Sequence, residues 1–428
     1  MDSEFHYWVT GVIAYEAGFS EEETEIIAYG SQLVDENDIL YKVRNISGRI
    51  YENNLSQTMD IFRSPEYLSE IYAYFHFIPD YQEGMSDTGK DIYTRPNSPI
   101  AQKFLHTALS LAEDNPQKIY RIAIASHAYV DTWAHQNFCY YYTTFNIDTL
   151  ADLKREFHLL GTLKHPLRTL FNRIMRTLSI GHGSFKHQPD EIGMVWSDTR
   201  PDVDKHIPND EGVVINNDRF IEAAEYLYRH YRTYLESKDV SPRLSWGELR
   251  EKIESIWQEE SQEVRIKLYR KLLPLSFRGI FDKMRWFNDA IFTEEHGRRD
   301  STNPLVHHFT IMIDKYYWRI GESHSGAREQ FDTIPDDALG YKRSHWYLFQ
   351  ESIKDHMRLG DELLGDMFDR VNFSRAKDSI IRSMSWFYDL LHGNNHTANV
   401  FFRISIIIMF LWGVVSGTYM IIDLAGLR

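Results

Sequence analysis

The sequence predicts an all-α protein that consists of a multi-helix metal-binding domain, a second helical region and one C-terminal transmembrane helix. The chain has 23 glycines and 13 prolines among 428 residues, about 8% together, against roughly 12% in average proteins. This low content argues against a turn-rich β fold. Apolar residues recur at helical spacing in several long segments, and one long run near the C-terminus carries no charge.

Two segments of the N-terminal half are the clearest helix candidates. Residues Glu21–Val34 carry an apolar stripe at helical spacing, and Gln117–Tyr141 form the longest apolar candidate, rich in small residues that allow close packing. Pro79–Pro99 and Ser179–Gly212 are predicted loops, because glycine, proline and polar residues gather there. No run of alternating strands is evident.

A boundary is expected near residue 240. Ser237–Leu244 has the composition of a linker, and Ser245 with Glu248 forms the capping-box signature of a helix start before a strongly charged helical run. We therefore expect three parts: residues 1–238 as the metal-binding domain, residues 239–398 as a helical regulatory or interaction region, and residues 401–424 as a transmembrane helix.

The predicted membrane span is the apolar run Ile404–Ile422, which holds no charge between Arg403 and Asp423. As a helix it would be about 28 Å long, close to the roughly 30 Å hydrocarbon core of a bilayer. A buried core helix is the alternative interpretation. No signal peptide is expected at the N-terminus, so we expect a single-pass tail anchor with the N-terminal domains in the cytoplasm. Gly413 and Gly417 form a GxxxG motif, which favours a homo-oligomer.

The composition limits the chemistry. With 47 Lys+Arg against 62 Asp+Glu the net charge is −15, so no long nucleic acid is expected as a partner, because the phosphate backbone favours a basic face. Cys139 is the only cysteine, which excludes an intramolecular disulfide and a cysteine-based zinc site. The 19 histidines leave imidazole and carboxylate as the ligands of any metal.

The clearest functional pattern is His127, Asp131 and His135, which recur every four residues and share one helix stripe. His127 and His135 would lie about 12 Å apart along the axis, too far for one ion with ligand distances of about 2.0–2.2 Å. Asp131 lies between them and could serve two neighbouring ions, so the spacing favours a multinuclear centre. The alternatives are a solvated polar stripe, for which the surrounding sequence is too apolar, and a structural network.

Further candidate ligands are scattered along the sequence, and each alone is more often structural than functional. They are His6, Asp35, His76, His182, His187, Asp190 and Glu191. Together with the stripe, their order resembles that of the zinc-dependent phospholipase C and single-strand nuclease superfamily. The resemblance covers about residues 1–235. It implies an all-helical fold with three zinc ions in a cleft and the hydrolysis of phosphodiester bonds.

The resemblance also implies a central cluster in which one carboxylate bridges two ions. Its members are Asp35, His76, His127 and Asp131. Asp131 matches the bridging ligand. An unengaged oxygen of Asp35 could orient the attacking water as a general base, so Asp35 and Asp131 are the predicted catalytic residues.

The remaining ions are less closely defined by the resemblance. His6 matches a ligand near the N-terminus, where the superfamily also uses a processed N-terminal tryptophan and this sequence has Met1. His135 matches the other ion, and the sequence leaves open which histidine and which acid join it. The choices are His182 or His187, and Asp190 or Glu191. We therefore expect two to three Zn²⁺ ions.

A basic stretch in this acidic chain lies between residues 154 and 176. It is either a solvated helix face or a surface that contacts the anionic phosphate of a lipid headgroup or a nucleotide. Its basic residues are Lys154, Arg155, Lys164, Arg168, Arg173 and Arg176.

These observations predict a membrane-anchored, zinc-dependent phosphodiesterase of phospholipase C type, a hydrolase that acts on phospholipids at the cytoplasmic face. One alternative is a nuclease or nucleotide phosphohydrolase at the membrane. Another is a non-catalytic membrane-associated sensor or effector whose metal cluster is structural. Residues 239–398 are expected to restrain the activity or to bind an unknown regulatory partner.

Overall fold

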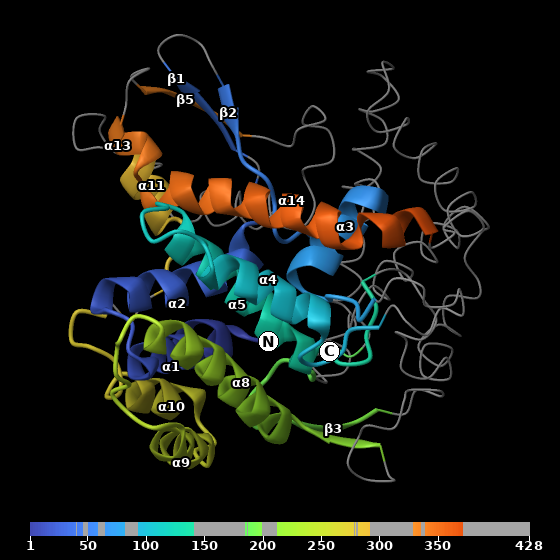
Figure 1. The fold of residues 1–428 in the computed structure, drawn as a ribbon, viewed down its shortest axis with the longest axis vertical. Coiled ribbons are helices and arrows are strands. Elements are labelled where there is room, and N and C mark those ends of the chain that lie inside the picture. The colour runs from blue at the N-terminus through green and yellow to red at the C-terminus, as the bar shows by residue number, and fades with distance from the viewer. Residues whose placement is uncertain are drawn as a thin grey trace, which may run out of the picture.

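The computed structural model is mostly helical (Figure 1), which confirms the helical class that the sequence predicts. It describes residues 1–39, 41–45, 50–58, 65–81, 93–140, 185, 187–198, 212–277, 279, 281–291, 328–334 and 339–370. Three predicted features lie outside these residues. They are the transmembrane helix at 401–424 with Gly413 and Gly417, the basic residues between 154 and 176, and His182.

The chain starts with a short π-helix, η1 (Glu4–Val9), which continues into α1 (Thr10–Ala17). Every residue of η1 is buried. The next helix, α2 (Glu21–Glu36), confirms the prediction for Glu21–Val34. It begins with a capping box, because the Ser20 hydroxyl accepts from the Glu23 amide and the Glu23 carboxylate accepts from the Ser20 amide.

Helix α5 (Lys118–Ala134) is the central element of the fold (Figure 1). It packs against α2, α3 (Pro65–Phe75), α4 (Pro99–Leu109), α8 (Asn216–Glu236) and α14 (His345–Arg370), and nearly all of its residues are buried.

The prediction for Gln117–Tyr141 is correct in position and too long at its C-terminal end, because α5 ends at Ala134. Asn137 adopts a φ of 67°, a left-handed conformation that asparagine tolerates better than most residues and that does not continue a helix.

Helices α2 and α5 approach closely at Gly30. A Cβ atom at this position would lie 2.8 Å from the Cβ of Ala123, which is shorter than an ordinary van der Waals contact. The absence of a side chain at Gly30 therefore lets α2 pack directly on α5, and both helices carry candidate ligands.

Residues beyond the predicted boundary near 238 form α9 (Trp246–Trp257), α10 (Gln262–Tyr269), α11 (Arg285–Ile291), α13 (Leu339–Lys342) and α14. The capping box of Ser245 and Glu248 is confirmed at the start of α9. Helix α10 packs against η1, and α14 packs against α3, α4 and α5. Described residues on both sides of the boundary share one hydrophobic core, and the division into two domains stays a prediction.

Two small sheets lie beside the helices, and the sequence analysis did not predict them. The first has the order β2-β1-β5, formed by β2 (Ile50–Glu52), β1 (Tyr41–Asn45) and β5 (Arg328–Ile334), with β1 antiparallel to β2 and parallel to β5. The second pairs β3 (Val195–Ser197) with β4 (Val213–Ile215). These strands are short, so their alternation is too brief to recognise in the sequence.

None of the helices that the structure describes is both long and apolar enough to cross a membrane.

Candidate metal centre

The last two turns of α5 deliver two of the predicted ligands, His127 and Asp131, and His135 occupies the position after the helix end. The exposed fraction of all three residues is below 5%. The i, i+4 spacing therefore places the three side chains on a buried stripe, as the sequence predicts. A buried carboxylate and two buried imidazoles need polar or charged partners.

The π-helix η1 brings His6 to this stripe. The Nε2 atom of His6 lies 3.0 Å from Oδ1 of Asp131, and its ring stacks on that of His127 with centroids 3.9 Å apart. Burial lowers the pKa of His6 to about 4, and the nearby amino group of residue 1 adds to this effect. Burial and His6 together lower the pKa of His127 to about 4. Both imidazoles are therefore neutral at pH 7, which is the state that binds metal.

Asp35, next to the C-terminal end of α2, places its carboxylate beside three histidines of the cluster. Its Oδ1 atom lies 3.7 Å from both His76 Nδ1 and His127 Nε2, and its Oδ2 atom lies 3.9 Å from His6 Nε2. The side chain of Asp35 has an exposed fraction of 23%, the largest of the cluster. Burial nevertheless raises its pKa, against the opposing effect of His127 and His76.

His76 follows the C-terminal end of α3, and its backbone neighbours fix which ring nitrogen faces the cluster. Its Nε2 atom lies 2.8 Å from the carbonyl oxygen of Ser56. Because a carbonyl can only accept, Nε2 carries a proton, and Nδ1 is the nitrogen that faces Asp131 Oδ2 and His127 Nε2, each at 3.3 Å. A histidine ligand held by a backbone carbonyl in this way is typical of metal sites.

A backbone carbonyl also fixes the orientation of the His135 ring. Its Nδ1 atom lies 2.6 Å from the carbonyl oxygen of His76, so Nδ1 donates to that carbonyl and Nε2 is the nitrogen that faces Asp190 Oδ1 at 3.1 Å. Asp190 lies at the end of the turn formed by residues 187–190. The side chains of Asn216 and Arg219 hold this turn by donating hydrogen bonds to its backbone carbonyls. Arg219 donates to the carbonyls of Ala134 and Pro189.

The amino group of Met1 is the member of this cluster that the sequence analysis missed. It is fully buried and contacts Asp131 Oδ1 and, at 3.3 Å, Asp190 Oδ1. Burial lowers its pKa, but Asp131 and Asp190 outweigh that effect and raise the pKa to about 11. The charged amine therefore fills the space between these two carboxylates in the present structure.

The structure thus brings together seven of the predicted ligands and leaves others apart. The assembled residues are His6, Asp35, His76, His127, Asp131, His135 and Asp190. His187 is exposed, and Glu191 is half-buried with its backbone carbonyl accepting from Asn216. Asp190 is therefore the acid that lies beside His135.

Two groups within the cluster have the compactness of a metal site. They are His6, His127 and Asp131, and Asp35, His76 and His127, each with ligand atoms within 4.8 Å of one another. Imidazole nitrogens and carboxylate oxygens are the donors that zinc prefers when cysteine is absent. The Nε2 atoms of both His6 and His127 face the carboxylates of Asp35 and Asp131. The residues present therefore fit a divalent transition-metal ion.

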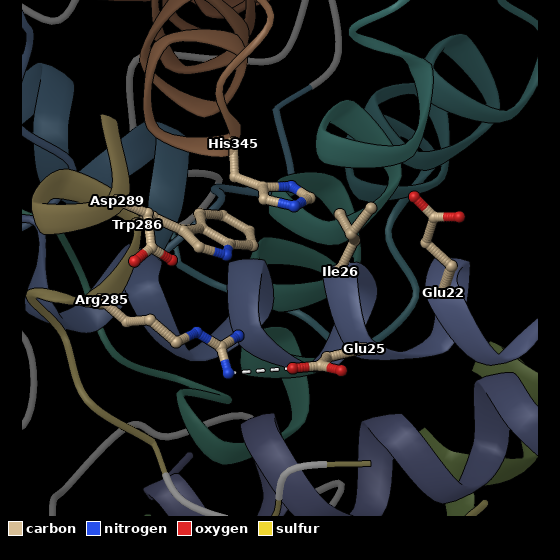
Figure 2. A pocket seen from close by; sticks show the side chains of 7 residues that line it. All are labelled: Glu22, Glu25, Ile26, Arg285, Trp286, Asp289 and His345. Carbon is tan, nitrogen blue, oxygen red and sulfur yellow. Dashed lines mark hydrogen bonds and ion pairs between the residues drawn. The ribbon is translucent and has the colours of Figure 1, made fainter. Parts of the chain in front are cut away.

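A cavity of about 120 Å³ lies elsewhere, between α2, α11 and the start of α14 (Figure 2). The Arg285 guanidinium, on one side of it, pairs with Glu25 at 2.9 Å, and the His345 ring stacks on Trp286. None of the ligands assembled above lines this cavity, so it is not part of the metal centre.

Comparison with known proteins gives one match. DUF6765, described as a family of unknown function, matches residues 1–360. The match runs through the predicted boundary near 238 and ends within α14. No curated protein and no solved structure matches the chain.

Proposed function

We propose that the chain, which belongs to the DUF6765 family, is a metal-dependent phosphodiesterase. The observation that carries the proposal is the way two carboxylates divide the cluster. Asp131 directs Oδ1 to His6 and Oδ2 to His76 and His127. Asp35 does the same with its own two oxygens, since its Oδ2 faces His6 and its Oδ1 faces His76 and His127.

This division supports two adjacent ions rather than one. One ion would be held by His76 and His127, and the other by His6, with Asp35 and Asp131 offering an oxygen to each. The donors, imidazole and carboxylate, favour zinc. The third zinc that the resemblance implies would need the space where the Met1 amine lies between Asp131 and Asp190.

A pair of divalent ions lowers the pKa of a bound water and neutralises charge on phosphate oxygens, which is the chemistry of phosphodiester hydrolysis. The position of the ligands in the fold determines how water and substrate reach the centre. Asp35 is the most exposed ligand, so water and substrate reach the centre from its side.

We propose a phospholipid as the substrate, at a membrane surface. The support is in the sequence, namely the apolar run Ile404–Ile422 and the basic stretch between residues 154 and 176. A tail anchor would raise the effective concentration of lipid substrate at the enzyme. A nucleotide or a single-stranded nucleic acid shares the phosphodiester chemistry and is the competing substrate class.

The test begins with metal analysis of the full chain by mass spectrometry. We expect two equivalents of zinc in the wild-type protein and less than half an equivalent in Asp131→Asn, because the uncharged amide keeps only one oxygen for the two histidine groups. Asp355→Asn is the matched control, since its carboxylate pairs with the buried Arg121 at 3.2 Å and lies outside the cluster. Metal content that is equal in Asp131→Asn and the wild type would contradict the proposed centre.

Activity is then measured on phosphatidylcholine vesicles, single-stranded DNA and bis-p-nitrophenyl phosphate. Hydrolysis of the vesicles that is lost in Asp131→Asn and after chelation, and is restored by zinc, supports the phospholipase. Hydrolysis of DNA or of the reporter alone supports the competing class. Tightly bound zinc without hydrolysis of any substrate would overturn the enzymatic proposal and favour a structural cluster.

A further inference from the structure

A second pair of histidines faces each other at the surface, away from the buried cluster. His106 lies in the last turn of α4 and is exposed, and His230 lies in α8 and is half-buried. The Nε2 atom of His106 is 3.0 Å from the Nδ1 atom of His230. Both helices pack against α5, so the backbone of each histidine is held by the core.

The contact of His230 with Tyr129 of α5 determines which nitrogen of the His230 ring carries the proton. The buried Tyr129 hydroxyl is 2.6 Å from Asn97 Oδ1, which can only accept, so the single hydroxyl proton of Tyr129 is donated there. A phenol keeps this proton at neutral pH. His230 Nε2 lies 3.0 Å from the same hydroxyl oxygen and must therefore be the donor.

It follows that Nδ1 of His230 carries a lone pair and directs it outward, at His106. Burial, with a contribution from His106, also lowers the pKa of His230 to about 4, so the ring is neutral. A histidine whose far nitrogen donates to a fixed acceptor, while its near nitrogen presents a lone pair, has the arrangement of a metal ligand with an outer-shell partner.

The spacing of the two nitrogens suits one ion. Two bonds of about 2.0–2.1 Å from a common ion, at angles of roughly 90–110°, place their nitrogens about 2.9–3.4 Å apart. The present 3.0 Å lies within this range. We propose that His106 and His230 form a second, peripheral site for a late first-row transition-metal ion such as Cu²⁺, Ni²⁺ or Zn²⁺.

Binding requires one proton to move. In the present structure His106 Nε2 donates to His230 Nδ1, because that nitrogen is the acceptor. When an ion binds, the proton leaves Nε2 of His106 and Nδ1 of the same ring takes one up from water, so the ring exchanges one tautomer for the other. His106 is exposed, and water can therefore mediate this exchange. Water completes the remaining coordination positions.

The test uses Cu²⁺ alone as the probe, added to the full chain with its own metal content undisturbed. We expect one equivalent to give an electron paramagnetic resonance spectrum with hyperfine coupling to two imidazole nitrogens. The double variant His106→Ala/His230→Ala should lose this signal. Lys103→Ala, one turn earlier on the exposed face of α4, is the matched control and should keep it. A spectrum of the double variant that equals the wild type would overturn the proposal.

Tyr129→Phe separates a metal site from a simple hydrogen-bonded pair. It keeps both ligands and removes the acceptor of His230 Nε2, so the two-nitrogen signal should remain while copper affinity falls roughly 10- to 100-fold. Unchanged affinity would contradict the role of Tyr129 in holding the lone pair outward. Zinc bound at the buried cluster, measured by mass spectrometry, should be the same in all variants, because this second site shares no residue with it. The outcome is therefore independent of the proposed hydrolase.

Discussion

Arg265 forms a bidentate ion pair with Glu4, buried between α10 and the π-helix η1. The Nε atom of Arg265 lies 2.7 Å from Oε1 of Glu4, and its Nη2 atom lies 2.7 Å from Oε2. The exposed fractions of the two side chains are 8% and 0%, and the hydroxyl of Tyr269 donates to the same carboxylate at 2.9 Å. Since Glu4 precedes His6 by two residues, this pair fixes the segment that brings His6 to the cluster.

We expect Arg265→Met to destabilise the protein by about 3–5 kcal/mol, because it leaves the buried Glu4 carboxylate without its partner. Lys267→Met is the matched control on the same helix. Lys267 also forms an ion pair of 2.7 Å, with Glu263, but both side chains are more than 60% exposed, and such pairs contribute about 0–1 kcal/mol. Urea unfolding of both variants measures the difference. Equal effects of the two substitutions would contradict the supporting role of Arg265.

Helix α14 reaches the cluster through polar contacts to residues around His76. Gln350 Nε2 donates to Asn37 Oδ1 at 2.9 Å, and Asn37 Nδ2 donates to Ser56 Oγ at 3.2 Å. Ser56 supplies the carbonyl that holds His76. A second contact, from His356 Nε2 to the carbonyl of Tyr74 at 2.9 Å, fixes the end of α3 just before His76. The region after residue 238 therefore takes part in orienting His76.

Gln350→Leu should lower stability by about 1–3 kcal/mol, because it leaves the buried Asn37 Oδ1 with one donor fewer. It should also speed the loss of zinc to a chelator, since Ser56 and His76 are then held less firmly. The control is Ser352→Ala on the same helix, whose hydroxyl donates to Leu348 of its own helix at 2.7 Å. Zinc release is followed with a chromogenic chelator. If the two variants release zinc at the same rate, α14 does not orient the ligand.

Two glycines in helices should respond to alanine in opposite directions. Gly30→Ala places a Cβ 2.8 Å from Ala123 Cβ, so α2 and α5 must move apart at a cost of about 1–3 kcal/mol. At Gly365 in α14, no atom of the described residues lies within 4 Å of the place that a Cβ would occupy. Gly365→Ala should therefore stabilise the helix by about 0.5–1 kcal/mol. Thermal unfolding of both variants measures the sign. A stabilised Gly30→Ala would contradict the close contact of α2 with α5.

Local sequence signals were sufficient for part of the site. The four-residue spacing of His127, Asp131 and His135 fixes their common stripe on any helix, and capping residues such as Ser20 and Ser245 mark where helices start. These features depend on neighbours within one or two turns. The helical class and the shared face of these three side chains could therefore be predicted.

Contacts between distant segments could not be predicted in the same way. The choice between Asp190 and Glu191 depends on a turn in which the Asp190 amide donates to the His187 carbonyl and on side chains that follow much later, such as Arg219. The contacts of Gln350 with Asn37 and of Arg265 with Glu4 join residues more than 250 positions apart. No periodicity or spacing in the sequence reports such a pair.

The pH dependence of stability provides a last prediction, for His356 in α14. Its ring is 1% exposed and stacks between Phe75 and Phe104. Burial lowers its pKa to about 3, and the nearby Arg121 adds to this, against the opposing hydrogen bond to the Tyr74 carbonyl. Between pH 6.5 and pH 3 the unfolded chain therefore binds a proton that the folded protein does not bind, and stability falls as the pH decreases through this range.

From pH 7 to pH 5 the contribution of His356 should amount to about 2 kcal/mol, given an unfolded pKa of roughly 6.5. His356→Gln removes the titration but keeps an N–H donor for the Tyr74 carbonyl. The free energy of unfolding in urea, measured at both pH values, should therefore fall by about 2 kcal/mol less in the variant than in the wild type. The other buried histidines are common to both proteins and cancel in this difference. An identical decrease in the two proteins would show that His356 is protonated in the folded state, which its apolar surroundings oppose.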